Sequence, residues 1–257
     1  MRPVPYIGIT GFTTNEQVQR VVRAAEIPRF YPYLMIGVLV SENTLAGHPA
    51  KWPKRNPAKE KIASIFEPFA TTINLVHYHT TDQSTLVGQL VAMDTLAGDH
   101  CDGYQLNMPW PDPRLLEQYL SQAIARNKKR TIVLQCGRRA LEKFGKNPRR
   151  IAEEVRTNYE GLVDYVLIDP SGGKGEEIDS HFAVDCLNEL MQIRNIGPGI
   201  AGGLSYESGY AKLAPIAQDI DENFSVDAEG RMRDSNDDLD IDKCIGYVSE
   251  MSKFFAH

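Results

Sequence analysis

The side chains most able to do chemistry lie between Tyr165 and Asp179, in the stretch YVLIDPSGGKGEEID. The apolar run from Tyr165 to Ile168 has the length and branched residues of a buried parallel strand, and the proline and glycines that follow do not continue a strand. Asp169 therefore comes at the carboxyl end of a strand. In proteins that alternate strands and helices, this edge of the sheet carries the active site. Asp169 is predicted to be a general acid or base, and the alternative is that it only caps the turn.

Polar residues also follow two earlier apolar runs. His77 and His79 lie two residues apart and so share one face of a strand. We expect them to form hydrogen bonds in a pocket or at its rim. A metal pair is the alternative, although no third ligand has a suitable spacing. Gln105 and Asn107 share a face in the same way, where amides commonly orient a ligand or simply form a satisfied polar layer.

The elements that must position these residues repeat along the whole chain. Apolar runs alternate with amphipathic helical runs, a pattern typical of a parallel sheet with helical crossovers. Eight runs are predicted to be strands, near residues 5–10, 34–40, 73–79, 103–107, 131–136, 164–169, 199–201 and 223–228. Eight such units, each about 30 residues long, predict an α/β fold with a single (β/α)8 TIM barrel over residues 1–257. No GxGxxG motif follows the first run, which argues against an open dinucleotide-binding sheet.

Local signals predict where several helices begin. Asn56, Asp112 and Asn147 each precede a proline, and a capping side chain followed by proline is typical of a first helical turn. The segment 41–55, SENTLAGHPAKWPKR, is predicted to be an irregular loop that acts as a lid over the mouth of the barrel. Its basic residues, Arg55 among them, are expected either to meet an anionic ligand or to be solvated.

Composition limits the classes of function. The net charge of −6 argues against nucleic-acid binding, which calls for a clustered basic surface. No apolar run approaches the length of a membrane span or of a secretion signal, so we expect a cytoplasmic protein. The four cysteines are widely separated and form no CxxC pair, which predicts neither a zinc site nor a disulfide framework. The oligomeric state does not follow from the sequence.

Three segments together resemble phosphoribosylanthranilate isomerase, a (β/α)8 barrel enzyme of tryptophan biosynthesis. The first, IDPSGGKGEEID, matches the family pattern D…GGxGxxxD. The second is AGGL at residues 201–204, which is similar to the family's AGGL after strand seven. The third is FSVDAEGRMRD at residues 224–234, which resembles the family's strand-eight segment with its glutamate and later aspartate, here Glu229 and Asp234. The resemblance implies an Amadori rearrangement, in which a general acid opens a phosphoribosyl ring and a general base moves a proton from C2.

The resemblance also implies roles for residues. The acid role falls on Asp169. The family's base is a cysteine directly before the GIT of the first strand, and this chain has Ile7 there, which cannot accept a proton. General base catalysis is worth about 10²- to 10⁴-fold, so the original isomerase activity needs another base. Cys136, at the end of the fifth run, is the candidate for a relocated base, with a buried structural thiol as the alternative.

In the family, a phosphate rests between the glycine turn after strand seven and a short helix after strand eight. This implies ligand contacts from the residues Gly172, Gly173, Lys174, Gly175, Gly202, Gly203, Ser225, Asp227 and Glu229. Asp227 stands where the family has a small residue, and a carboxylate beside a phosphate costs on the order of 1 kcal/mol in water and several in a partly buried site. Either basic neighbours offset this cost, or Asp227 points outward, or the pocket binds hydroxyl groups there instead.

The resulting prediction is a divergent, isomerase-like enzyme. It acts by acid–base chemistry on a small phosphorylated or polyhydroxylated carbon compound, a sugar phosphate being one candidate. The alternative is a barrel that binds a metabolite without turning it over. Neither a metal nor a cofactor is predicted, and the partner is a small molecule, with no nucleic acid or membrane. The pocket is expected to be lined by Arg55, His77, His79, Gln105 and Asn107.

Overall fold

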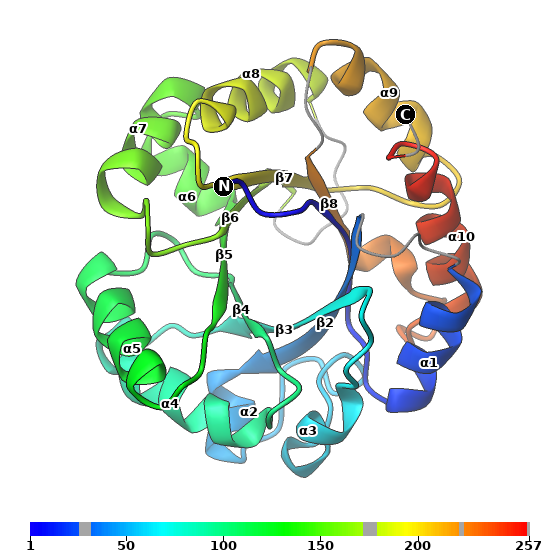
Figure 1. Cartoon of the computed structure of the whole chain (residues 1–257). Helices are drawn as coiled ribbons and strands as arrows, with labels where there is room; N and C mark the ends of the chain where they lie inside the picture. Colours follow the sequence, from blue (N-terminus) through cyan, green and yellow to red (C-terminus); the bar gives the residue numbers. More distant parts are fainter. Residues whose placement is uncertain (26–31, 172–178, 221–223, 256–257) are drawn as a thin grey trace.

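Eight parallel strands form a closed barrel in which each strand pairs with the next along the chain and β8 pairs with β1 (Figure 1). The computed structural model describes residues 1–25, 32–171, 179–220 and 224–255. The strands are β1 (Tyr6–Thr10), β2 (Tyr33–Ser41), β3 (Thr72–His79), β4 (Gly103–Leu106), β5 (Thr131–Gly137), β6 (Tyr165–Asp169), β7 (Gly197–Ala201) and β8 (Ser225–Ala228). The prediction of a (β/α)8 barrel is confirmed.

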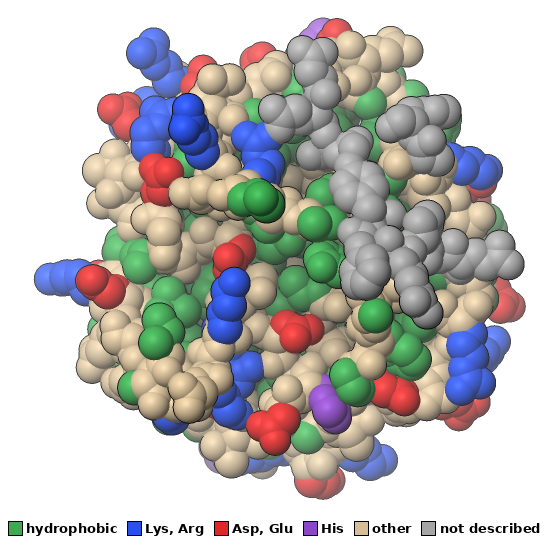
Figure 2. Space-filling view, viewed as in Figure 1, with side chains coloured by type: hydrophobic (Ala, Val, Ile, Leu, Met, Phe, Trp, Pro, Cys, Tyr) green, Lys and Arg blue, Asp and Glu red, His purple; other side chains and the backbone are tan. Residues whose placement is uncertain are grey.

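Helices surround the barrel and connect its strands (Figure 1). The α-helices are α1 (Asn15–Ala24), α2 (Glu42–Ala46), α3 (Ile62–Ile65), α4 (Leu86–Leu96), α5 (Pro113–Ala125), α6 (Arg138–Lys143), α7 (Pro148–Asn158), α8 (Ser180–Met191), α9 (Gly209–Gln218) and α10 (Ile241–Ser252). Three short 3₁₀ helices are η1 (Lys59–Lys61), η2 (Gln83–Thr85) and η3 (Gly230–Met232). None of the helices in the described part of the chain is long and apolar enough to cross a membrane. On the face shown in Figure 2, basic and acidic side chains are interspersed.

Two of the three predicted helix starts are confirmed. The Asp112 carboxylate accepts a hydrogen bond from the backbone N–H of Arg114, and the Asn147 side chain accepts one from the N–H of Arg150, so both cap the helices that follow. The prediction at Asn56 is wrong. Its side-chain amide donates to the carbonyl oxygen of Trp52 at 2.9 Å and closes the preceding turn, so it does not cap a helix.

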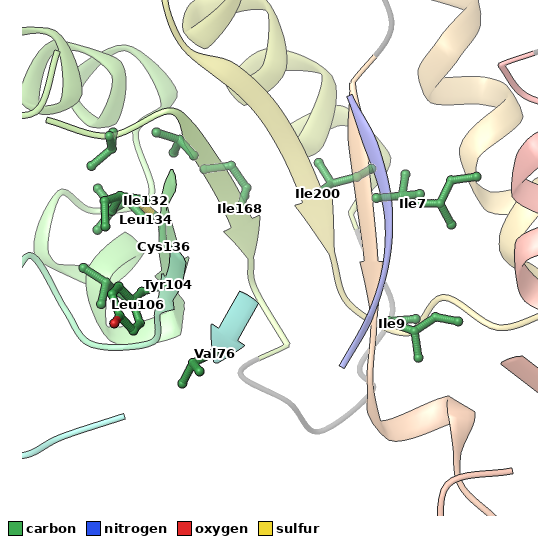
Figure 3. Packing of buried hydrophobic residues seen from close by; sticks show 14 of the residues in the cluster. Ile7, Ile9, Val76, Tyr104, Leu106, Ile132, Leu134, Cys136, Ile168 and Ile200 are labelled. Carbon is green, nitrogen blue, oxygen red and sulfur yellow. The ribbon is translucent and has the colours of Figure 1, made fainter. Parts of the chain in front are cut away.

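Alternate residues of each strand face opposite sides of the barrel wall, and two apolar layers result. One layer packs between the strands and the helices, and Figure 3 shows Ile7, Ile9, Cys136 and Ile168 within it. The other fills the lower interior of the barrel, with Tyr6, Met35, Ile73, Leu75, Val133, Tyr165, Leu167 and Ala201. Burying one such aliphatic side chain stabilises the fold by about 1.5–3 kcal/mol, so these layers hold the strand ends in place.

The interior of the barrel changes from apolar to polar toward the carboxyl ends of the strands. Above the inner apolar layer lie buried polar side chains from six strands, namely Thr10, His77, Gln105, Gln135, Asp169 and Asp227. Buried polar groups cost free energy unless they find partners, so a closed layer of them must be either a hydrogen-bonded network or a site for a ligand.

Candidate functional site

A pocket opens in this polar layer at the carboxyl ends of the strands. Its empty space is about 410 Å³ when the open mouth is included. Polar side chains from β3, β5, β6 and β8 line it, together with the turns after β7 and β8; the polar lining residues are His77, Gln135, Asp169, Ser171, Asp227, Glu229 and Arg231. The position agrees with the general placement of active sites in (β/α)8 barrels.

Asp169, at the end of β6, is 3% exposed and accepts hydrogen bonds on both carboxylate oxygens. Gln135 Nε2 donates to Oδ2 at 2.8 Å. Ser171 donates to Oδ1 twice, from its backbone N–H at 3.1 Å and from its hydroxyl at 2.7 Å. Asp169 therefore does organise the turn that follows it, and it also forms part of the pocket wall. The two alternatives considered from the sequence are not exclusive.

Gln135 joins Asp169 to two more strands. Its Oε1 lies 2.8 Å from His77 Nε2 and accepts a second hydrogen bond from Gln105 Nε2 at 3.1 Å. Because the Gln135 amide gives its N–H to the Asp169 carboxylate, its oxygen must face His77, and we assign the proton of the imidazole to Nε2. Burial lowers the pKa of His77, against the opposing effect of Glu229 and the bond to Gln135, so the ring is neutral at pH 7. Among the described residues, its Nδ1 has no hydrogen-bond partner.

Asp227 lies on β8 and is 5% exposed. Gln105 Nε2 donates to its Oδ2 at 3.0 Å, and the Thr10 hydroxyl lies 3.5 Å from its Oδ1. Burial, with the nearby carboxylates of Glu229 and Asp169, raises the pKa of Asp227 from 3.8 to about 7, although the Gln105 hydrogen bond opposes this shift. Asp227 points into the barrel, so the predicted alternative of an outward side chain is wrong.

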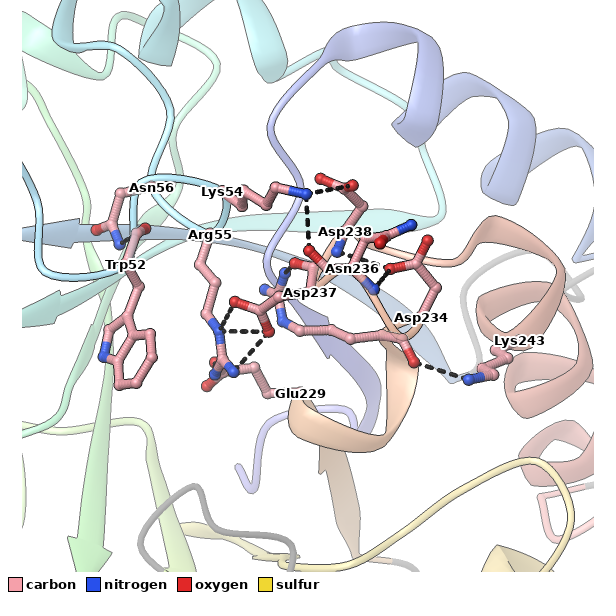
Figure 4. Close-up of polar contacts among 11 residues, drawn as sticks. Trp52, Lys54, Arg55, Asn56, Glu229, Asp234, Asn236, Asp237, Asp238 and Lys243 are labelled. Atoms are coloured by element: carbon pink, nitrogen blue, oxygen red, sulfur yellow. Dashed lines mark hydrogen bonds and ion pairs between the residues drawn. The ribbon is translucent and has the colours of Figure 1, made fainter.

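Glu229 connects the pocket to the loop before α3. Its carboxylate lines the pocket and pairs with Arg55 Nη1 at 3.2 Å, and each of these side chains is 21% exposed. Arg55 also forms a two-pronged ion pair with Asp237, with Nη2 at 2.7 Å and Nε at 2.9 Å from its oxygens (Figure 4). The hydrogen bonds to Asp237 raise the pKa of Arg55. Arg55 thus lies behind Glu229 and does not itself line the pocket.

The segment predicted to be an irregular lid is partly helical. Ser41 caps α2 through a capping box with Thr44, so the first part of the segment has regular structure. Its later part is tied to the loop after β8, because Lys54 Nζ lies 3.0 Å from a carboxylate oxygen of Asp238 (Figure 4). Lys54 and Arg55 are thus held at the rim by ion pairs with carboxylates of this protein, namely Asp238 for Lys54 and Glu229 and Asp237 for Arg55.

The glycine turn after β7 also borders the pocket. Gly202 and Gly203 have φ angles of 119° and 62°, in the region that favours glycine, and both line the pocket. Gly230 and Arg231, from the short helix η3 after the neighbouring strand β8, also line the pocket. The predicted residues Gly172, Gly173, Lys174 and Gly175 lie outside the described residues.

Several predicted site residues lie elsewhere. Cys136 is 1% exposed in the apolar layer between the strands and the helices, and burial raises the pKa of its thiol, so the prediction of a relocated base is wrong. Ser225 is fully buried below the pocket, where its hydroxyl accepts a hydrogen bond from the N–H of Tyr6. His79 is exposed at the rim, with Nδ1 bonded to the carbonyl oxygen of Asn107 at 2.7 Å. Within the described residues, no group of three or more His, Cys, Asp or Glu side chains is arranged to hold a metal ion.

Sequence reasoning missed Gln135, Ser171 and Thr10. Gln135 is the only polar side chain within the apolar core of its strand, and it lies one residue before Cys136. Since Val133 faces the barrel interior, the two-residue period of a strand places Gln135 on the inside and Cys136 on the outside. The same period places Ile7 on the outer face. A cysteine at position 7 of this chain would face the helices and lie outside the pocket. The isoleucine at this position therefore does not deprive the pocket of a base.

The geometry defines a (β/α)8 barrel with an acidic pocket at the carboxyl ends of its strands. No protein-family model and no curated protein sequence matches the chain. Solved structures share its fold. Phosphoribosyl anthranilate isomerase from Thermus thermophilus superposes with a TM-score of 0.61 at 12% identity, covering 99% of this chain and 100% of that chain.

Two further structures extend the comparison. TrpF from Jonesia denitrificans has a TM-score of 0.59 at 14% identity over 96% of both chains. Orotidine 5'-monophosphate decarboxylase from Methanocaldococcus jannaschii has a TM-score of 0.50 at 10% identity, over 96% of this chain and 99% of that chain. The similarity to phosphoribosylanthranilate isomerase expected from three short segments is confirmed for the fold. Identities this low carry no information on the reaction.

Proposed function

We propose that this chain is an enzyme that rearranges a small phosphorylated or polyhydroxylated carbon compound by acid–base chemistry, with Asp169 as a catalytic residue. The observation that carries the proposal is the presence of two buried carboxyl groups, Asp169 and Asp227, in the wall of one pocket. Burying ionisable groups costs stability, and a fold that only needed a packed interior would have apolar residues there. Carboxyl groups with unlike surroundings in one cleft are typical of catalytic sites.

The pocket also favours a substrate with hydroxyl groups at its inner end. Carboxylate oxygens of Asp169 and Glu229 accept hydrogen bonds, and neutral His77 adds an acceptor nitrogen. At the outer end, the backbone of Gly202 and Gly203 and the side chain of Arg231 form the wall. Glycine turns and basic side chains are common partners of phosphate groups, so we place a phosphate at this end of the substrate.

The second candidate function is a barrel that binds a metabolite without turning it over. It is favoured by the composition of the pocket, because no cysteine is among the described residues that line it, whereas the resemblance pairs a cysteine base with the acid at Asp169. A binding protein needs the shape and the hydrogen bonds of the pocket but no proton transfer.

An activity assay on the purified protein, run beside Asp169→Asn, separates the two candidates. The first substrate is phosphoribosylanthranilate, followed by ribose 5-phosphate, fructose 6-phosphate and the corresponding unphosphorylated sugars. An enzyme should lose turnover by about 10²- to 10⁴-fold or more in the variant, with little change in its circular dichroism spectrum. Running the variant also guards against activity from a contaminating host enzyme.

If the wild type turns over none of these compounds, thermal shift measurements with the same panel test the binding alternative. A rise in melting temperature with any sugar phosphate, retained in Asp169→Asn with altered affinity, supports a binding protein. Comparing each phosphorylated sugar with its unphosphorylated form shows whether the glycine turn binds the phosphate.

A further inference from the structure

We propose that Asp227 is the proton donor of this pocket and that Asp169 is its proton acceptor. The assignment rests on the proposed acid–base function, and it differs from the acid role that the family resemblance implies for Asp169. It is derived from the different surroundings of the two carboxyl groups.

The contacts of Asp169 suit an ionised carboxylate. Gln135 donates to Oδ2, and the orientation of this amide is held by a second contact, because its Oε1 already accepts a hydrogen bond from Gln105. The backbone N–H of Ser171 donates to Oδ1. Neither N–H can accept a hydrogen bond, and the Ser171 hydroxyl adds a third contact at 2.7 Å from Oδ1. Three contacts of 3.1 Å or less therefore stabilise the ionised form of Asp169. The site therefore presents Asp169 as an acceptor.

The contacts of Asp227 suit a neutral carboxylic acid. Its partners are the Gln105 amide at 3.0 Å, the Thr10 hydroxyl at 3.5 Å and the backbone N–H of Ala228. All three are uncharged, and the Thr10 contact is longer than the three contacts given for Asp169. The hydroxyl of Thr10 faces the other oxygen of Asp227 and is able to accept a proton as well as to donate one. The carboxyl group is almost completely buried, and Asp169 and Glu229 are the charged groups that act on it. Desolvation and like charge both favour the protonated form.

The barrel reserves space for this carboxyl group. Gly8 of β1 pairs directly with Asp227 of β8, and a Cβ atom at position 8 would lie 2.8 Å from Asp227 Oδ1 and 2.8 Å from the terminal methyl carbon of Met35. A side chain on Gly8 would displace the carboxyl group from its position between Thr10 and Gln105. Packing therefore explains the glycine at position 8, because only a residue without a side chain leaves room for the carboxyl group of Asp227.

The two groups perform a balanced isomerisation. Asp169 removes a proton from the carbon next to a carbonyl group, and the electron pair of that C–H bond forms a carbon–carbon double bond. The carbonyl oxygen takes the proton of Asp227 as its own double bond opens, which gives an enediol. Asp169 then returns its proton to the former carbonyl carbon, while Asp227 regains a proton from the hydroxyl group on the neighbouring carbon. No oxidant, reductant or leaving group is required.

The test is the variant Asp227→Asn, assayed with the substrate found for the wild type. An asparagine fits without a steric change, since its oxygen accepts from Gln105 and its amide donates to the Thr10 hydroxyl. We expect kcat to fall by about 10²- to 10⁴-fold. As a control for the loss of one acidic group, Asp99→Asn changes a 91% exposed side chain and should retain wild-type kcat.

The pH dependence gives a second readout. In the wild type, kcat/KM should fall as pH rises through about 7, where Asp227 loses its proton. The titratable groups whose charge acts on or is affected by Asp227 are Asp169 of β6, Glu229 after β8, Tyr6 of β1 and Tyr247 of α10. Burial raises the pKa of both tyrosines well above 10, so neither produces this fall near neutral pH. The fall should be absent from the residual activity of Asp227→Asn.

Carbon-13 NMR of protein labelled at the aspartate carboxyl carbons tests the same group without a substrate. One signal should titrate near pH 7 and be missing from Asp227→Asn. Titration of that signal near pH 4, the ordinary range of aspartate, would overturn the donor role. Wild-type kcat in Asp227→Asn would also overturn it, while leaving the proposed function intact if Asp169→Asn is inactive. A wild type that turns over no substrate would remove the function and the donor role together.

Discussion

Replacing Asp227 by asparagine should make the protein more stable at neutral pH and above. The carboxyl group is buried, and its pKa in the folded protein is raised to about 7 from an ordinary value of 3.8. At pH values below about 4, the group is neutral in both the folded and the unfolded chain and has no ionisation penalty. Between pH 4 and 7 the unfolded chain ionises first, so the wild type loses stability as pH rises through this window.

The magnitude follows from the two pKa values. Each pH unit between them is worth 1.36 kcal/mol, so the interval from 3.8 to about 7 corresponds to a penalty on the order of 4 kcal/mol above pH 7. Asparagine carries no charge and avoids this penalty while keeping the contacts with Thr10 and Gln105. Between pH 5 and pH 8, the stability advantage of Asp227→Asn should therefore grow by about 2–3 kcal/mol.

The assay is reversible urea unfolding at pH 5 and pH 8, followed by circular dichroism. The free energy of unfolding of wild type, Asp227→Asn and the control Asp99→Asn is compared at each pH. Asp99 forms an exposed ion pair with Lys128, so its replacement should change stability by no more than about 1 kcal/mol at either pH. An advantage of Asp227→Asn that does not grow between pH 5 and pH 8, or a variant less stable than wild type at pH 8, would refute the reasoning.

Three further substitutions have outcomes that follow from the geometry. Gly8→Ala places a methyl group against the carboxyl group of Asp227, so it should cost about 1–3 kcal/mol in urea unfolding and also abolish turnover. Arg55→Ala removes the ion pairs with Glu229 and Asp237 and should lower the unfolding free energy by about 1 kcal/mol, and Arg55→Lys, which cannot form the two-pronged pair, should recover less than half of it. Cys136→Ala should keep kcat within about twofold of wild type while costing about 1 kcal/mol of stability, because the thiol is a core group; a large loss of kcat without a loss of stability would restore the base role.

The eight strands of the barrel were predictable from the sequence because the signals are local. Most strands, such as β2 and β3, are runs rich in apolar, branched residues, whereas β4, β7 and β8 are short and carry polar residues, glycine or proline. Asp112 and Asn147 cap helices through bonds to backbone groups two or three residues away. The end of β6 at Asp169 follows in the same way. Such interactions are complete within one element and do not depend on the rest of the chain.

The residues that line the pocket were harder to predict, because a shift of one residue along a strand moves a side chain from the inner to the outer face of the barrel. Cys136 was favoured for its chemistry, yet its neighbour Gln135 faces the interior and contacts Asp169. The strand period contains this information only once one residue of the strand is known to face inward. Likewise Ile7, whose type suggested a lost base, faces the helices.

The sequence by itself determined the order of the elements, their approximate ends, and the presence of acidic residues at the carboxyl ends of β6 and β8. Only the tertiary structure decided which side chains meet and in which protonation state. Gln105 and Asp227 are 122 residues apart and come into contact only when the barrel closes. The raised pKa of Asp227 likewise depends on burial by several strands and on carboxylates from β6 and after β8, and desolvation is a property of the closed barrel, which no single segment of the chain has.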